Sequence, residues 1–144
     1  MEHVEYVHTT GMDESDVDAR LRESEHGVLA LADGDDAYGI PLSHHYDGER
    51  LLLRVSRHDD DAEKVRYLDT TETATFVVYE ASTERSWSIV VRGPIHRADV
   101  DVDEATLNEW FPPFRLFDED VEDVAFDLYD LEAESVVGRR TLGP

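Results

Sequence analysis

The most informative stretch of the chain is LLLRVSRHDDDAEKVRYL, residues 51–68. Leu51, Leu53 and Val55 alternate with other residues, and this period of two is typical of a half-buried strand. A basic turn follows, and then a short helix whose aspartate-rich start suits the positive end of the helix dipole. That helix carries Lys64, the only lysine of the chain. We expect an anion to bind between the end of the strand and the helix.

The residues alone leave two interpretations of this basic turn open. The side chains of Arg54, Ser56, Arg57 and Lys64, together with the amides of a helix start, could saturate the oxygens of a phosphate. Alternatively, Lys64 forms a solvated ion pair with Glu63 or Asp60. Arg54 could likewise pair with a glutamate of a neighbouring strand, because an unpaired charge is costly to bury.

The composition indicates one acidic domain spanning residues 1–144. Lys and Arg number 13 and Asp and Glu number 35, which gives a net charge of -22. Such a chain offers no basic groove, so we expect no nucleic-acid partner. The hydrophobic residues, 40% of the total, form orderly runs that indicate a folded core. We interpret the acidity as a halophilic surface, because carboxylate repulsion is screened when the Debye length falls to about 3 Å in 1 M salt.

Several classes of site are excluded by residue type. The chain has no cysteine, which excludes disulfides, thiolate metal sites and thiol nucleophiles. No apolar run approaches the ~20 residues of a membrane span, and no signal pattern opens the chain, so we expect a cytoplasmic protein without membrane contact. His44 and His45 are adjacent in a predicted strand and point to opposite faces, which disfavours a shared metal ion. We interpret them as turn residues, and a role for one of them beside a ligand stays open.

The remaining elements are mostly strands. A helix begins after Asp13 and Gly27 ends it, and Asp-Gly turns join the first hairpins. Pro41 inside the second strand implies a bulge or an edge there. The predicted helices span residues 13–24, 59–68 and 103–111, and the predicted strands span 28–32, 37–43, 51–56, 73–79, 87–91 with a continuation to 98, 124–131 and 136–140, with a possible edge strand at 4–7. About six or seven strands in meander order with short helices predict a mainly β protein, a small antiparallel barrel.

The order of these parts resembles a known family. A helix is followed by LALADGDDAYGIPLSHHYDGERLLLRVS (29–56), by a helix with Lys64, and by TATFVVY (73–79) and WSIVVRG (87–93). This order is similar to that of the pyridoxamine 5′-phosphate oxidase-like, FMN-binding split barrels. Within them it looks most like the small branch that includes nitroimidazole-resistance-type reductases. The resemblance covers roughly residues 13–140 and rests on several short motifs in the right order.

The resemblance implies a six- to seven-stranded antiparallel split barrel that forms a homodimer, with FMN in grooves between the subunits. Lys64 would contact the flavin phosphate, and Arg54 and Ser56 would donate to phosphate or ribityl oxygens. The cofactor-binding positions implied in this chain are Pro41, Leu42, Ser43, Arg54, Val55, Ser56, Lys64, Trp87 and Ser88. From the residues alone, Trp87 and Trp110 with Phe111 are more readily explained as core or dimer-interface aromatics. The apolar run of residues 110–114 would form a dimer contact or, alternatively, cover the partner's flavin.

The function implied is that of an oxidoreductase, which passes electrons from a reduced nicotinamide to a small acceptor or to dioxygen. The same fold could instead bind the deazaflavin F420, or serve as a non-catalytic flavin-binding, haem-binding or sensing module. No side chain of the sequence indicates a general acid or base, so no catalytic residue is predicted. The substrate leaves no recognisable pattern.

Overall fold

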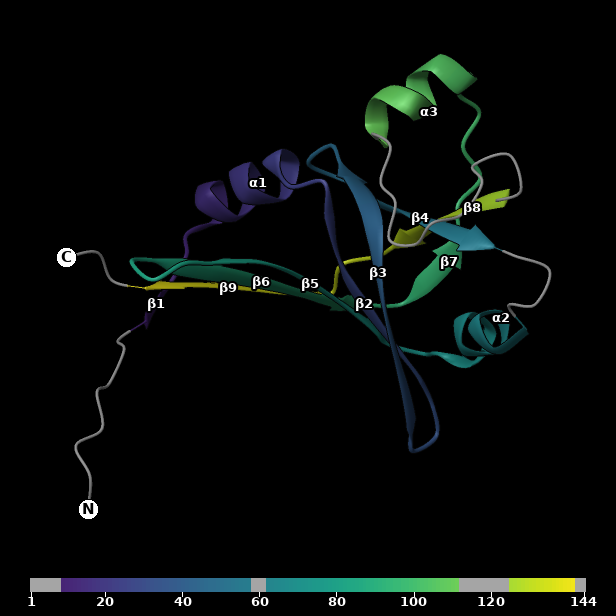
Figure 1. Cartoon of the computed structure of the whole chain (residues 1–144), viewed down its shortest axis with the longest axis horizontal. Coiled ribbons are helices and arrows are strands. Elements are labelled where there is room, and N and C mark those ends of the chain that lie inside the picture. The colour runs from purple at the N-terminus through teal and green to yellow at the C-terminus, as the bar shows by residue number, and fades with distance from the viewer. Residues whose placement is uncertain (1–8, 58–61, 112–124, 142–144) are drawn as a thin grey trace.

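The computed structural model of the protein describes residues 9–57, 62–111 and 125–141. In the described part of the chain, single short helices separate runs of strands (Figure 1). In chain order the elements are β1 (Thr9–Gly11), α1 (Glu14–Glu23), β2 (His26–Asp33), β3 (Asp36–Tyr46), β4 (Leu51–Arg57), α2 (Ala62–Thr70), β5 (Ala74–Ala81), β6 (Ser86–Gly93), β7 (Ile95–Arg97), α3 (Glu104–Trp110), β8 (Ala125–Leu131) and β9 (Ser135–Thr141). The predicted edge strand at residues 4–7 lies outside the described residues.

All nine described strands form one antiparallel sheet in the order β1-β9-β6-β5-β2-β3-β4-β8-β7. This confirms the mainly β, split-barrel fold. The strand count exceeds the prediction because β1 and β7 have three residues each, too few to show a period of two. The predicted meander holds only for β2, β3 and β4. After α2 the chain returns to pair β5 with β2, a long-range contact that local sequence does not encode.

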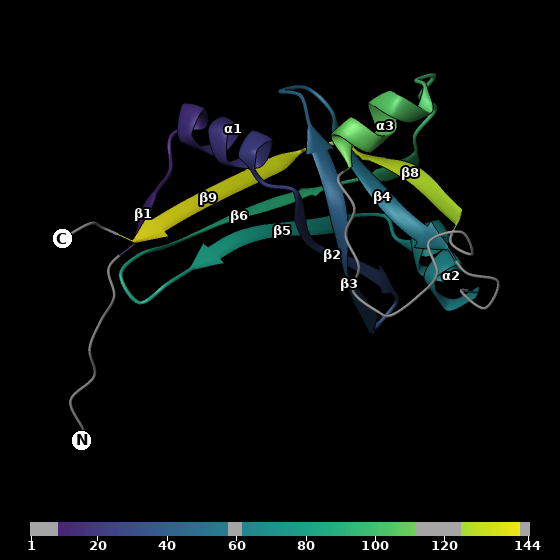
Figure 2. The same ribbon diagram turned by 45° about the horizontal axis from the view of Figure 1, so that its top comes forward.

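The core lies on one face of this sheet, which we call the inner face. Leu29, Leu53, Phe76 and Ile89 are fully buried there. Leu21 of α1 joins the same cluster, and α1 runs along β9 and β6 in both views of the ribbon (Figures 1 and 2). The opposite face is called the outer face. Both views place α3 beside β4 and β8 and place α2 beyond the end of β4.

The local signals place most element ends correctly. Asp13 caps α1 by accepting a hydrogen bond from the Asp16 amide, and Asp103 caps α3 through Thr106. The expectation for Gly27 is wrong, because α1 ends at Ser24 and Gly27 lies inside β2. A Cβ at Gly27 would lie 2.6 Å from the Val77 carbonyl oxygen, so close strand packing explains this glycine.

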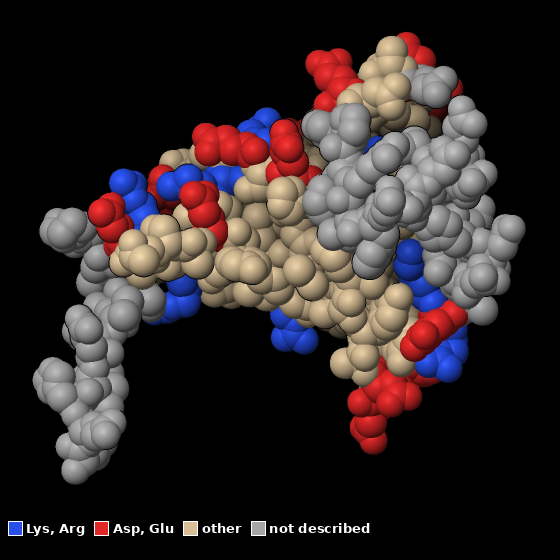
Figure 3. Space-filling model, in the orientation of Figure 1, with Lys and Arg blue, Asp and Glu red and all other residues tan. Residues whose placement is uncertain are grey.

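The charge of the chain is spread unevenly over its surface. Figure 3 shows acidic side chains over α1, over α3 and at the tip of the β2–β3 hairpin, with a broad uncharged surface between them. Cationic side chains lie among the acidic ones near α1 and α2. No helix within residues 9–57, 62–111 and 125–141 is long and apolar enough to span a bilayer.

Candidate functional site

Strands β3 and β4 bring three of the predicted binding residues together on the outer face. Ser43 lies directly opposite Arg54 in the register of the two strands. Ser56 lies two residues beyond Arg54 and therefore on the same face. Ser43 is buried, whereas Arg54 and Ser56 are half-buried. The strands therefore present a guanidinium between two hydroxyl-bearing residues.

Lys64 joins this group from α2. Its Nζ donates a hydrogen bond to the Ser56 carbonyl oxygen at 2.6 Å. The lysine therefore lies at the end of β4, where the sequence predicts an anion, and the bond ties the helix to the strand. Asp60 lies outside the described residues, so the predicted alternative ion pair with it is not described.

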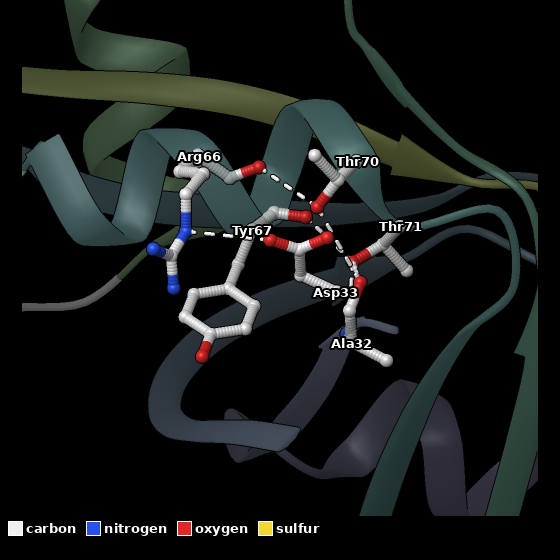
Figure 4. A network of polar contacts seen from close by, with 6 residues as sticks. All are labelled: Ala32, Asp33, Arg66, Tyr67, Thr70 and Thr71. Atoms are coloured by element: carbon white, nitrogen blue, oxygen red, sulfur yellow. Dashed lines mark hydrogen bonds and ion pairs between the residues drawn. The ribbon is translucent and has the colours of Figure 1, made fainter. Parts of the chain in front are cut away.

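A polar network holds the other end of α2 against the β2–β3 hairpin (Figure 4). The Thr71 hydroxyl accepts a hydrogen bond from the Ala32 amide at 3.0 Å and donates one to the Tyr67 carbonyl oxygen at 2.5 Å. Arg66 pairs with Asp33 at 3.6 Å on the exposed side. Because Thr71 is buried, these bonds also satisfy polar groups that would otherwise be costly to bury. The position of Lys64 is thus set at both ends of its helix.

Arg54 lies in an aromatic environment. Its guanidinium carbon is 4.2 Å from the ring centre of Phe126 and 5.7 Å from that of Phe111. Its Nη1 donates to the Phe111 carbonyl oxygen at 3.4 Å. Burial lowers the pKa of Arg54, since a desolvated cation is disfavoured. Such an environment favours an added anion.

The alternative in which Arg54 pairs with a glutamate of a neighbouring strand is not supported. The residues opposite Arg54 are Ser43 on β3 and Leu128 on β8, and neither is acidic. Among the described residues, no carboxylate lies within ion-pair distance of its guanidinium.

The other predicted binding residues are distributed over both faces. Leu42 and Val55 are buried on the inner face and can offer only backbone groups to an outer-face ligand. Pro41 is exposed and pairs with Val28 of β2. The pairing of β3 with β4 begins only at Ser43, so β4 does not pair with β3 at Pro41. Pro41 therefore lies on a locally unpaired edge of β3, one of the two outcomes predicted for it.

Trp87 and Ser88 are adjacent on β6 and point to opposite faces. Trp87 is buried on the inner face, and the guanidinium carbon of Arg20 lies 5.3 Å from the centre of the Trp87 ring. Its indole Nε1 is buried without a hydrogen-bond partner among the described residues. Ser88 is half-buried on the outer face, between Tyr79 and Arg139. The structure therefore does not bring Trp87 together with Arg54.

The two adjacent histidines also point to opposite faces, as expected. His44 is buried on the inner face, where its Nε2 donates to the Leu21 carbonyl oxygen at 3.2 Å, and burial lowers its pKa to about 4. His45 lies on the outer face, stacked on the Trp110 ring at 4.6 Å. Neither is a turn residue, because β3 continues through Tyr46. Among the described residues no group of three or more His, Asp or Glu side chains could hold a metal.

The aromatic residues around Arg54 and His45 are the part of the site that sequence reasoning missed. Trp110 and Phe111 reach them from the end of α3, and Phe126 reaches Arg54 from β8. The apolar run after α3 indicated an interface or a cofactor cover, but its partner strand is far away in the sequence. Residues 112–114 of that run lie outside the described residues.

Two hollows lie next to this region. One, of about 160 Å³, is lined by His45, Trp110 and the end of α1. The other, of about 460 Å³, is lined by Arg20, Tyr79 and Trp87. Neither of these two hollows is lined by Arg54, Ser56 or Lys64.

Comparisons with known proteins agree with this fold. A family model described as pyridoxamine 5′-phosphate oxidase matches residues 13–140. The comparison with curated proteins gives no match. Among solved structures, the FAD binding protein from Mycobacterium smegmatis is 17% identical with a TM-score of 0.64, covering 92% of this chain and 98% of that one.

Two further solved structures have a TM-score of 0.66. The FAD and heme binding protein from Mycobacterium smegmatis is 17% identical, and the match covers 94% of this chain and 74% of that one. A provisionally named 5-nitroimidazole antibiotic resistance protein from Bacteroides thetaiotaomicron is 13% identical, with coverages of 98% and 95%. At these identities the structures establish the shared fold, and the family model covers most of the sequence. The chain belongs to the pyridoxamine 5′-phosphate oxidase family.

Proposed function

We propose that this protein binds FMN and acts as an oxidoreductase, passing electrons from a reduced nicotinamide to a small acceptor or to dioxygen. The flavin would lie between two copies of the chain. The observation that carries this proposal is the group formed by Ser43, Arg54, Ser56 and Lys64 at the end of β4. Solved structures of the same fold are named as FAD binding proteins, which supports a flavin.

The donor set of this group fits a phosphate. Arg54 is planar, has five N–H donors and can bind two oxygens at once, while Lys64 supplies a compact charge. Ser43 and Ser56 add hydroxyl donors from the neighbouring strands. A chain with a net charge of -22 repels anions at long range, so an anion site needs cations concentrated at one place. The end of β4 meets that requirement.

The chain itself would bind and orient the cofactor. A bound flavin supplies the redox chemistry, accepting a hydride equivalent and passing on electrons. The backbone of β3 around Pro41 and Ser43 would contact its ring system, and Arg54 and Lys64 would hold its phosphate. Because the flavin is proposed to lie between two copies of the chain, the second copy would help to exclude water from it.

The first test is the identity of the chromophore. Protein purified in molar KCl is examined by absorbance, and any chromophore is released by heat and identified by chromatography. Release of FMN supports the proposal, while FAD or F420 would correct the identity of the cofactor. A colourless protein that takes up none of these would contradict flavin binding.

The second test concerns Lys64. Replacement of Lys64 by alanine removes one phosphate contact and should raise the Kd for FMN about tenfold, which equals a loss of about 1.4 kcal/mol. The Kd is measured by quenching of flavin fluorescence in molar KCl. The matched control is Arg66→Ala, which removes a cation from the same helix that pairs with Asp33 instead.

The control should change the Kd by less than about twofold. An unchanged Kd in Lys64→Ala, with circular dichroism showing an intact fold, would reject the phosphate role of Lys64. Equal losses in both variants would indicate a general effect of charge or of helix stability.

A second candidate function is supported by the names of the similar structures. One of them is a FAD and heme binding protein and another is a heme binding protein, both from Mycobacterium smegmatis. This chain could therefore bind flavin or haem without catalysis. Steady NADH or NADPH oxidation by flavin-loaded protein, above the rate of free flavin, would favour the oxidoreductase. A haem spectrum in place of a flavin spectrum would favour the binding module.

A further inference from the structure

A cluster of aromatic side chains surrounds Arg54 on the outer face of β3, β4 and β8. The ring of Trp110 is stacked on the ring of His45, with 4.6 Å between the ring centres and 7° between the planes. Phe111 meets the same histidine edge-on at 6.4 Å. Phe111 and Phe126 both lie against the guanidinium of Arg54. We call His45, Trp110, Phe111 and Phe126 the aromatic clamp.

The strand register explains why two members of the clamp lie next to Arg54. Arg54 pairs with Ser43, and His45 is two residues beyond Ser43 on the same face of β3. On the other side of β4, Phe126 pairs with Ser56, which is two residues beyond Arg54. His45 and Phe126 are therefore diagonal neighbours of Arg54, a separation that aromatic and long side chains can bridge.

The other two members are supplied by the end of α3. Phe111 is the C-cap of this helix, and its amide donates to the Leu107 carbonyl oxygen at 2.9 Å. The Phe111 side chain is 1% exposed, although it lies outside the core cluster of the inner face. The stack of Trp110 on His45 attaches this helix end to β3. The position of Phe111 beside Arg54 therefore depends on that stack.

The clamp holds Arg54 without using most of its hydrogen-bond donors. Nη1 donates to the Phe111 carbonyl oxygen, and the remaining side-chain N–H groups donate to no described residue. Aromatic rings attract a guanidinium through their faces and accept none of its in-plane hydrogen bonds. A long, rotamer-rich side chain loses conformational freedom when it binds an anion, and contacts that fix it beforehand reduce this cost. Arg54 is therefore pre-organised for a ligand.

We propose that the aromatic clamp positions Arg54 for the phosphate of FMN, which makes His45 and Trp110 positioning residues that set the preference for FMN over riboflavin. This inference rests on the proposed function and deepens it. Riboflavin has the same ring system and ribityl chain as FMN and lacks the phosphate. Loss of the clamp should therefore weaken the binding of FMN and leave the binding of riboflavin unchanged.

The test compares the Kd for riboflavin with the Kd for FMN, both measured by quenching of flavin fluorescence in molar KCl. Trp110→Ala removes the stack and should lower the ratio of the two constants about fivefold to tenfold. Trp110→Phe keeps a ring on His45 and should return the ratio to within about twofold of the wild type. The matched control is Asn108→Ala on the exposed side of α3, which should leave the ratio unchanged.

A double-mutant cycle tests whether the clamp acts through Arg54. Arg54→Ala alone should lower the ratio, because it removes a phosphate contact. In that background Trp110→Ala should lower the ratio no further, since a positioning residue has no effect once the residue it positions is absent. His45→Leu is a second variant in case Trp110→Ala alters the fold, which circular dichroism would reveal, and it should lower the ratio in the same direction.

Several results would overturn this assignment. One is a wild type that binds both flavins equally well, and another is a wild-type ratio in both Trp110→Ala and His45→Leu. Equal losses of FMN and riboflavin would place Trp110 against the flavin ring instead of behind Arg54. Additive losses in the double variant would show that Trp110 acts independently of Arg54. A wild type that binds neither flavin would overturn the proposed function itself and this assignment with it.

Discussion

At the scale of single residues, burial changes the chemistry of His44. The ring is 1% exposed and packs edge-on against Phe76, and its Nε2 proton is donated to the Leu21 carbonyl oxygen. Its Nδ1 is buried without a partner among the described residues. A second proton would therefore place a charge in the core. This is why the pKa falls from 6.5 to about 4.

The pH dependence of stability follows from this shift. Between pH 6.5 and about 4 the unfolded chain binds a proton at His44 that the folded chain does not bind. The free energy of unfolding therefore falls as the pH falls through this window, by about 3 kcal/mol in total for this group. His44→Gln retains a donor and cannot titrate, so its unfolding free energy should lack this loss.

The measurement is urea unfolding in constant molar KCl at several pH values from 7.5 to 4.5. The difference between His44→Gln and the wild type should change by about 2 kcal/mol over this range. His96→Gln is the control, because the His96 side chain is 63% exposed. Parallel curves for the wild type and His44→Gln would show that another group governs acid sensitivity.

At the scale of elements, Gly93 allows two parts of the sheet to cross. It ends β6, and the connection between β8 and β9 passes over it. The Glu132 amide donates to the Pro94 carbonyl and the Glu134 amide to the Arg92 carbonyl, both at 2.9 Å. A Cβ at Gly93 would overlap the Glu132 carbonyl oxygen and lie 2.9 Å from its carbonyl carbon.

Gly93→Ala should therefore destabilise the fold by about 3 kcal/mol, because backbone rather than a flexible side chain would have to move. Gly39→Ala is the matched control within a strand, since its Cβ would meet only the Val28 Cγ1 at 4.0 Å. The control should be neutral or stabilise by up to about 1 kcal/mol. Chemical unfolding at pH 7.5 measures both, and equal effects would contradict the crossing argument.

At the scale of the whole molecule, charge dominates the dependence on solvent. Among the described residues, ion pairs such as Arg22 with Asp18 and Arg97 with Asp127 neutralise only a few of the chain's 35 acidic residues. Figure 3 shows acidic side chains concentrated in separate surface areas. Folding brings these carboxylates closer together, so their repulsion destabilises the compact state when salt does not screen it.

We therefore expect the melting temperature of the flavin-free protein to rise between 0.1 M and 2 M KCl. Circular dichroism at a fixed protein concentration measures the transition. Sucrose at matched osmolality is the control. It is excluded from the protein surface but does not screen charge, so it separates stabilisation by solute exclusion from stabilisation by charge screening. A melting temperature that stays constant or falls with KCl would reject a halophilic surface.

The sequence by itself determined the local features of this protein. Apolar alternation located β3 and β4, the cap residues Asp13 and Asp103 located two helices, and the motif order identified the family. These features could be predicted because each depends on residues that are close in the chain. The single lysine likewise marked the helix that closes the end of β4.

Only the tertiary structure decided which of these elements meet. The pairing of β5 with β2 replaced the predicted meander. Arg54 meets Phe111 and Phe126, and Trp87 is separated from Ser88 by the plane of the sheet. Such contacts depend on strand order and register across many residues. Their energies come from long-range packing that no local pattern encodes.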